Sequence, residues 1–213
     1  MSNALPPQSA QTVERLLRWA GAAGIVGGTA LATAYLAHPP SATPETVAST
    51  IWTWVHALFV VSLIGGVFLL FALLTLYFRA GGGMAGFAGF AMALVSLVFV
   101  FGLDYAEVFI FPTLASEFPE AVVKYGDGTM MPSVAFAFPV TGALFLAGFV
   151  LLSWELHRTR AVARGAALLM LFGTIVFGVG LSGLLPMAVV RVGSVLFGAG
   201  LVWLGIDLLR RPR

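Results

Sequence analysis

The sequence predicts an all-α integral membrane protein, a bundle of six transmembrane helices with both termini in the cytoplasm. The first observation is compositional: of 213 residues, 60% are hydrophobic and 9% are charged, with a mean hydropathy of +1.00. An average soluble domain carries about 25% charged residues. The second is that six nearly charge-free stretches have the length of about 20 residues that a helix needs to cross a membrane. The third is that basic residues gather on alternate connections, as they do in cytoplasmic loops.

The six stretches predict a single transmembrane domain over 19–209, preceded by a cytoplasmic segment, 1–18. The first stretch follows Arg15 and Arg18 and has an Ala-rich end like that of a signal peptide, but we count it as a helix. The expected helices cover about 19–37, 48–78, 84–111, 133–154, 165–185 and 187–209.

Two connections on the expected outer side carry local signals. In the connection at 38–50, Thr43 has the character of an N-cap and Pro44 that of a first helical residue, so the second helix should begin before the membrane does. The outer loop at 113–132 should contain a short interfacial helix from Pro119 to Tyr125, ended by Gly126.

Orientation follows from the arginines and lysines. With loops assigned alternately, one side holds only Lys124 and Arg191. The other side holds nine arginines: Arg15, Arg18, Arg79, Arg158, Arg160, Arg164, Arg210, Arg211 and Arg213. This bias places that side, and both termini, in the cytoplasm. We therefore expect a multi-pass protein of the cell (inner) membrane with the lipid bilayer as its main partner.

Glycine and small residues indicate close helix packing. Gly24 with Gly28, and Ser194 with Gly198, have the four-residue spacing that lets helix backbones approach closely in a membrane. Glycines at a 76-residue offset also suggest a repeat that relates the second and third helices to the fourth and fifth.

Several function classes are excluded by missing residues. Cysteine is absent, which excludes thiolate metal sites and cysteine nucleophiles. The one lysine, Lys124, lies in a polar loop, so there is neither a P-loop nor an intramembrane lysine for a retinal Schiff base. No metalloprotease or serine-hydrolase motif occurs. A net charge of +2 with the arginines on one membrane face gives no reason to expect nucleic acid.

The candidate site is a cluster of ionisable residues near the outer boundary. His56 precedes Arg79 by 23 residues and Asp104 follows Gly82 by 22, each about 33 Å of helix. Glu107 shares a helix face with Asp104, and Arg191 must lie within the last helix for that helix to cross the membrane. We predict an outward-facing pocket formed by His56, Asp104, Glu107 and Arg191, with Arg191 within direct or water-bridged hydrogen-bond reach of Asp104 or Glu107.

Three functions fit this cluster. The first is binding or transport of a small molecule or ion, with no catalytic residue assigned; an inward ion pair that only joins helices is the competing structural interpretation. The second is an enzyme or cofactor protein, with His56, Asp104 and Glu107 as metal ligands or His38 and His56 as haem ligands, although His38 in its Pro-rich loop should be solvated. The third is a non-catalytic subunit, as a homo-oligomer or with a partner. The sequence identifies no cofactor.

Overall fold

The computed structural model describes residues 7–126, 128, 130–182 and 184–211. Positions 1–6, 127, 129, 183 and 212–213 lie outside the described residues, so the expectations for 1–18, 113–132 and 165–185 are compared only over the remainder. Within the described part the regular structure is entirely helical. The helices are α1 (Pro7–Ala37), α2 (Pro44–Val47), α3 (Thr50–Arg79), α4 (Met84–Phe109), α5 (Phe111–Glu117), α6 (Pro119–Tyr125), α7 (Pro132–Thr159), α8 (Arg164–Gly180) and α9 (Met187–Arg210).

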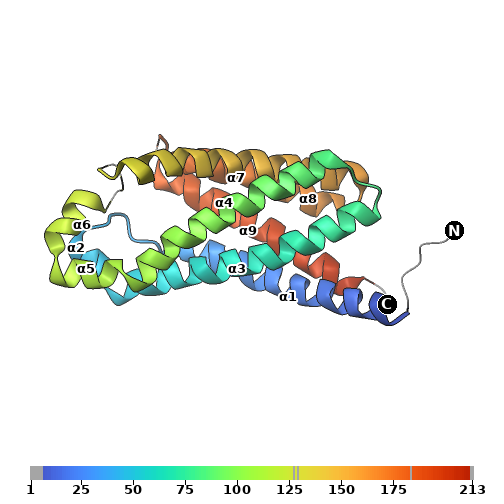
Figure 1. The fold of residues 1–213 in the computed structure, drawn as a ribbon, viewed down its shortest axis with the longest axis horizontal. Helices are drawn as coiled ribbons and strands as arrows, with labels where there is room; N and C mark the ends of the chain where they lie inside the picture. Colours follow the sequence, from blue (N-terminus) through green and yellow to red (C-terminus); the bar gives the residue numbers. More distant parts are fainter. Residues whose placement is uncertain (1–6, 127, 129, 183, 212–213) are drawn as a thin grey trace.

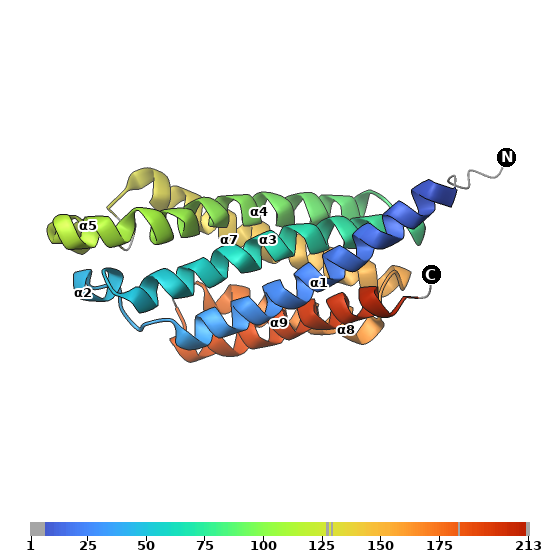
Figure 2. The same ribbon diagram turned by 90° about the horizontal axis from the view of Figure 1, so that it is seen from below.

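The long helices run along one common direction and form an elongated bundle (Figure 1). The short helices α2, α5 and α6 gather at one end, which we call the short-helix end. At the opposite end, which we call the terminal end, α1 begins and α9 ends, as the view from below also shows (Figure 2). The ends of the described chain therefore share one end of the bundle.

Five helical spans in the described chain are long and apolar enough to cross a membrane: Gln11–Ala37, Thr50–Arg79, Met84–Glu117, Pro132–Thr159 and Met187–Arg210. The sixth predicted span corresponds to α8, which has 17 residues and is shorter than the others. Its length of about 25 Å is at the lower limit for a spanning helix. Bulky apolar side chains such as Phe68 and Phe136, which are 59% and 74% exposed, cover the outside of the bundle. The fold is thus an apolar helical bundle consistent with a multi-pass membrane protein.

The helix boundaries differ from the sequence prediction at several places: α7 continues to Thr159 and α8 already ends at Gly180, and three further differences have local causes. Helix α1 already begins at Pro7, inside the segment 1–18, and its first part is held by an ion pair of 2.7 Å between Glu14 and Arg79 of α3. Thr43 caps α2 as predicted, but α2 is a separate short helix because Ser49 provides a second N-cap that starts α3. Helix α6 has the predicted bounds, whereas the preceding loop also contains α5.

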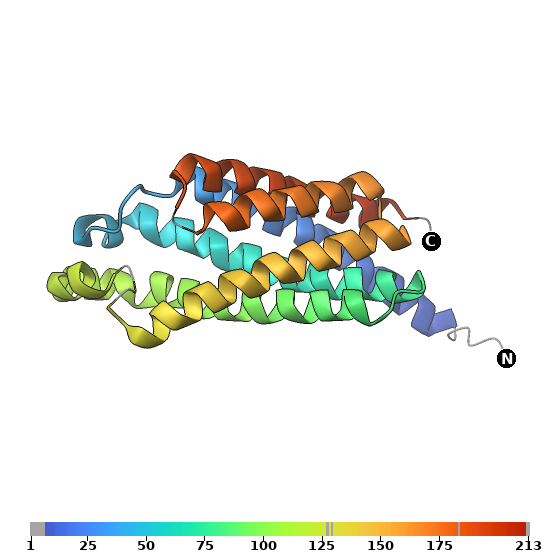
Figure 3. The ribbon, with the colours of Figure 1, turned by 90° about the horizontal axis from the view of Figure 1, so that it is seen from above.

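Glycines bring the backbones of neighbouring antiparallel helices into contact. A Cβ on Gly28 would collide with the carbonyl oxygen of Gly198, and one on Gly21 would meet the carbonyl oxygen of Gly205 at 2.8 Å, so α1 and α9 touch at two levels. The predicted role of Gly28 and Gly198 in close packing is confirmed. Gly24 instead faces Leu69 of α3. The α8–α9 and α4–α7 pairs are in similarly close contact, and α8 and α9 lie side by side when seen from above (Figure 3).

Candidate functional site

A cavity of about 310 Å³ lies inside the bundle, in the half nearer the short-helix end. It is lined by the last turns of α1 and α4, the first half of α3 and of α7, and parts of α8 and α9. Three of the four predicted site residues, His56, Asp104 and Glu107, line it. The structure thus brings together residues from α3 and α4 that the sequence could only place at a similar depth.

Glu107 and His56 are both tied to Trp52 in the first turn of α3. The indole Nε1 of Trp52 donates to Oε2 of Glu107 at 3.0 Å, which joins α3 to α4. One turn later, Nδ1 of His56 lies 2.9 Å from the carbonyl oxygen of Trp52. A carbonyl only accepts, so Nδ1 carries the proton and, in the neutral ring, Nε2 of His56 is an acceptor.

Asp104 is a buried acid of the cavity wall without a hydrogen-bonding partner among the described residues. It is 9% exposed, and among the described residues no hydrogen bond or ion pair reaches it. Glu107, which follows it by one turn on α4, accepts only the Trp52 indole. Burying a carboxylate without a hydrogen-bond donor or a cation is energetically costly. Asp104 and Glu107 can therefore accept a hydrogen bond or an ion pair from a bound molecule.

His38 also belongs to the cavity wall, contrary to the expectation of a solvated loop residue. It is partly buried, with its ring 5.4 Å from that of His56 and 5.5 Å from that of Trp52. Its Nδ1 lies 2.7 Å from the carbonyl oxygen of Pro39, which again leaves Nε2 as an acceptor in the neutral ring. Burial lowers the pKa of His38 below its usual value, and the nearby positive charge of Arg191 lowers the pKa further, against the opposing effect of the Pro39 carbonyl.

The predicted bond between Arg191 and an acid is wrong as a direct contact. Nη2 of Arg191 donates to the carbonyl oxygen of His38 at 3.1 Å, and no ion pair of the described residues joins Arg191 to Asp104 or Glu107. The reason is topological: α9 packs along α1 and α8, whereas both acids lie on α4. Arg191 does lie in the first turns of α9, as the length of the last span required.

The rest of the wall is mainly aromatic and aliphatic. Tyr35 packs against Phe59 and Phe177, with ring centroids 4.6 and 4.9 Å away, and Phe145 makes an edge contact with Phe197 at 5.4 Å. The hydroxyl-bearing residues Tyr35, Ser62 and Thr141 also line this surface. The cavity therefore combines an apolar, aromatic lining with a small group of polar atoms.

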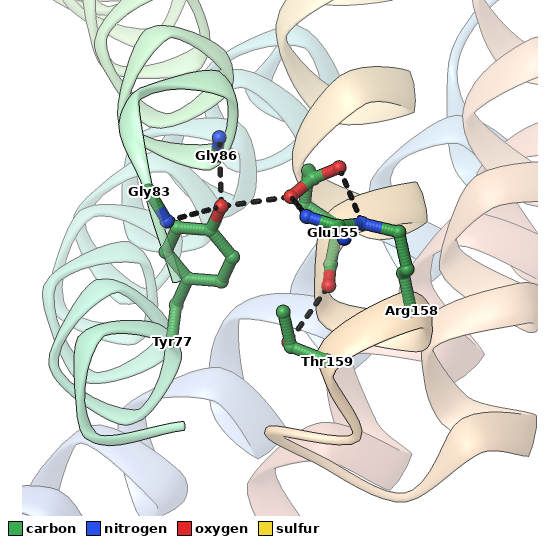
Figure 4. Close-up of polar contacts among 6 residues, drawn as sticks. All are labelled: Tyr77, Gly83, Gly86, Glu155, Arg158 and Thr159. Atoms are coloured by element: carbon green, nitrogen blue, oxygen red, sulfur yellow. Dashed lines mark hydrogen bonds and ion pairs between the residues drawn. The ribbon is translucent and has the colours of Figure 1, made fainter. Parts of the chain in front are cut away.

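The terminal end contains a contrasting acid, Glu155, whose carboxylate is fully engaged. It accepts from the Tyr77 hydroxyl at 2.8 Å and from Nε and Nη2 of Arg158 at 3.0 and 2.7 Å (Figure 4). The Tyr77 oxygen in turn accepts the backbone N–H groups of Gly83 and Gly86, at the start of α4. These contacts join the α3–α4 turn to α7, so this buried acid has a structural role that is complete without a ligand.

The metal and haem alternatives gain no geometric support. Within the described ranges no three His, Asp or Glu side chains gather closely enough to hold a metal ion, so His56, Asp104 and Glu107 do not form the expected ligand set. The two imidazoles of His38 and His56 contact each other edge to face at 5.4 Å. That spacing leaves no room between the rings for a metal with a planar macrocycle around it.

Sequence reasoning missed two members of the wall, Tyr35 and His38, and the role of Trp52 as the hydrogen-bond donor to Glu107. His38 directly follows Ala37, the last residue of α1, and this position was the available sequence signal, because it keeps the ring close to the end of the helix. The links between Trp52 and Glu107, and between Tyr77 and Glu155, join residues 55 and 78 positions apart. Neither has a local sequence signal.

Comparison with known proteins gives no assignment: no family model matches the chain, and no curated protein or solved structure is similar to it. We therefore infer its function from the cavity and its polar groups.

Proposed function

We propose that the chain is a six-span protein of the cell membrane that takes up a small organic molecule from the outer side into the cavity between α3, α4 and α7. In this proposal α8 is the sixth span, and the terminal end, which carries most of the arginines, faces the cytoplasm. The short-helix end then faces outward, and the cavity lies in the outer half of the bundle. Binding is the basic activity, and transport would be built on it.

The cavity itself carries the proposal. Its volume of about 310 Å³ falls within the range of small-molecule sites, and its wall has the mainly apolar lining with a few polar groups that such sites share. The buried Asp104 without a partner adds a specific reason to expect a guest, because Glu155 shows that this chain satisfies a purely structural acid with its own donors.

The test is to fill the cavity at a glycine. Gly142 lines it, and a Cβ built there meets nothing within 4 Å, so Gly142→Leu places a side chain into the space without a backbone collision. Gly102 on α4 is equally open but does not line the cavity, which makes Gly102→Leu the matched control.

The probe is 4-fluorobenzyl alcohol, a neutral aromatic molecule small enough for the cavity. Its ¹⁹F NMR line should broaden with the protein in phosphatidylcholine nanodiscs more than with empty nanodiscs. Gly142→Leu should remove the excess broadening and Gly102→Leu should keep it. Equal broadening by the two variants, or none by the wild-type protein, would refute the proposal.

A further inference from the structure

Apart from the hydroxyls of Tyr35, Ser62 and Thr141, the polar side chains of the cavity wall are acceptors. Nε2 of His38 and Nε2 of His56 are acceptors in the neutral rings, because Nδ1 of each donates to a backbone carbonyl at 2.7 and 2.9 Å. Asp104 and Glu107 contribute carboxylate oxygens, which only accept when ionised. Acceptors therefore dominate the polar part of the wall.

Positive charge is missing from the same wall. Neither arginine nor lysine lines the cavity in the described chain, and Arg191, in the first turns of α9, is held by the His38 carbonyl oxygen. Arg158 neutralises Glu155 at the terminal end, but Asp104 has no such counter-ion among the described residues. A positively charged guest would supply the charge that the protein does not.

The aromatic rings suit the same guest. Tyr35, Phe59, Phe145 and Phe177 line the cavity, and a cation over an aromatic face is attracted by the electron density of the ring. A metal ion would instead need several ligands close together, and no such group of three forms in the described chain. The lining therefore favours an organic cation over an inorganic one.

We infer that the cavity selects a small organic ammonium, a molecule with a protonated amine and an apolar or aromatic body. The ammonium donates to Asp104, with Glu107 and the two imidazoles as neighbouring acceptors, and the body lies against the aromatic rings. This inference rests on the proposed function, because it names the chemical class of the molecule that the cavity takes up.

The experiment compares three probes of the same shape and different charge on the wild-type protein in phosphatidylcholine nanodiscs. 4-Fluorobenzylammonium, 4-fluorobenzyl alcohol and 4-fluorobenzoate are titrated by ¹⁹F NMR against empty nanodiscs. We expect the ammonium to bind at least about tenfold more tightly than the alcohol, as a charge-assisted hydrogen bond gives, and the benzoate to bind most weakly. An alcohol that binds as tightly as the ammonium, or a benzoate that binds more tightly, would overturn the inference and leave the proposed function standing.

The source of the selectivity is tested with Asp104→Asn. This variant should lose the preference, so that it binds the ammonium no more tightly than the alcohol, and its circular-dichroism spectrum and melting temperature check that the fold is retained. Glu117→Gln removes one negative charge from an exposed position outside the cavity and should keep the preference. If Glu117→Gln lowers ammonium binding as much as Asp104→Asn does, surface charge explains the selectivity and the inference is wrong. If the wild-type protein binds none of the three probes, the proposed function fails as well.

Discussion

Replacing Tyr77 with phenylalanine should remove the contact that joins the α3–α4 turn to α7. The side chain is fully buried, and its hydroxyl donates to Glu155 and accepts the N–H groups of Gly83 and Gly86 at 2.9 and 3.2 Å. Gly83, the residue before α4, has no side chain to cap the helix, so the Tyr77 hydroxyl serves as the cap from the preceding helix. Tyr77→Phe deletes all three interactions without a change in ring packing.

The expected loss combines two contributions. Losing a helix cap costs about 0.5–2 kcal/mol, and losing a hydrogen bond to a charged group costs about 1.5–3 kcal/mol. Glu155 keeps both bonds from Arg158, which offsets part of the second contribution. We therefore expect the free energy of unfolding to fall by about 2–4 kcal/mol.

The measurement is an unfolding titration with sodium dodecyl sulfate in mixed micelles, followed by circular dichroism. Tyr105→Phe is the matched control, because the Tyr105 side chain is 49% exposed and the same atom is removed. That variant should change the free energy of unfolding by less than about 0.5 kcal/mol. A loss below about 1 kcal/mol for Tyr77→Phe, or equal losses for the two variants, would refute the reasoning.

Three further predictions concern orientation, packing and pH. A cysteine at Ser41 should react with a membrane-impermeant maleimide on intact cells and one at Thr159 only after permeabilisation; the reverse pattern would refute the orientation. Gly28→Ala should lower the free energy of unfolding by about 1–3 kcal/mol in the same titration, because its methyl group meets the Gly198 carbonyl, whereas Gly102→Ala should not lower it. Because the folded-state pKa of His38 is lowered from 6.5, the unfolded chain binds more protons as pH falls through that value, and stability declines. His38→Gln should make this decline shallower in thermal unfolding between pH 7 and pH 5, and an unchanged slope would contradict the prediction.

The sequence predicted the helical class and most of the long helices because apolar run length and capping residues are local signals. The expected start of the second span at 48 lies close to Thr50, where α3 begins, and the expected bounds of the short outer helix match those of α6. Depth along the chain also placed His56, Asp104 and Glu107 near one another, as residues of one cavity wall. Length alone could not decide α8, because its 17 residues are at the limit for a spanning helix.

The partners of the site residues could not be predicted, because depth does not say which helices are neighbours. Arg191 lies at the expected end of α9, but α9 faces α1 and α8, so its bond goes to the His38 carbonyl oxygen and not to an acid on α4. The Pro-rich connection was likewise expected to be exposed to solvent, but the ring of His38 packs against that of His56 in the cavity wall. Side-chain contacts across the bundle depend on which helices are neighbours, and a largely apolar sequence contains little information about that arrangement.

The glycine contacts divide the bundle into two mechanical units. Between α1 and α9, α1 and α3, α8 and α9, and α4 and α7, glycines meet backbone atoms of the neighbouring helix, so these pairs have little freedom to slide. Where α3 meets α4, a Cβ on Gly66 would meet only the Leu97 side chain, and where α7 meets α8, one on Gly178 would meet only that of Leu146. Side chains can change rotamer while backbones in contact cannot interpenetrate. The cavity is bordered by both units, so we expect its volume to depend on how the α4–α7 pair is seated against the other four long helices, to which the Tyr77–Glu155 contact links it at the terminal end.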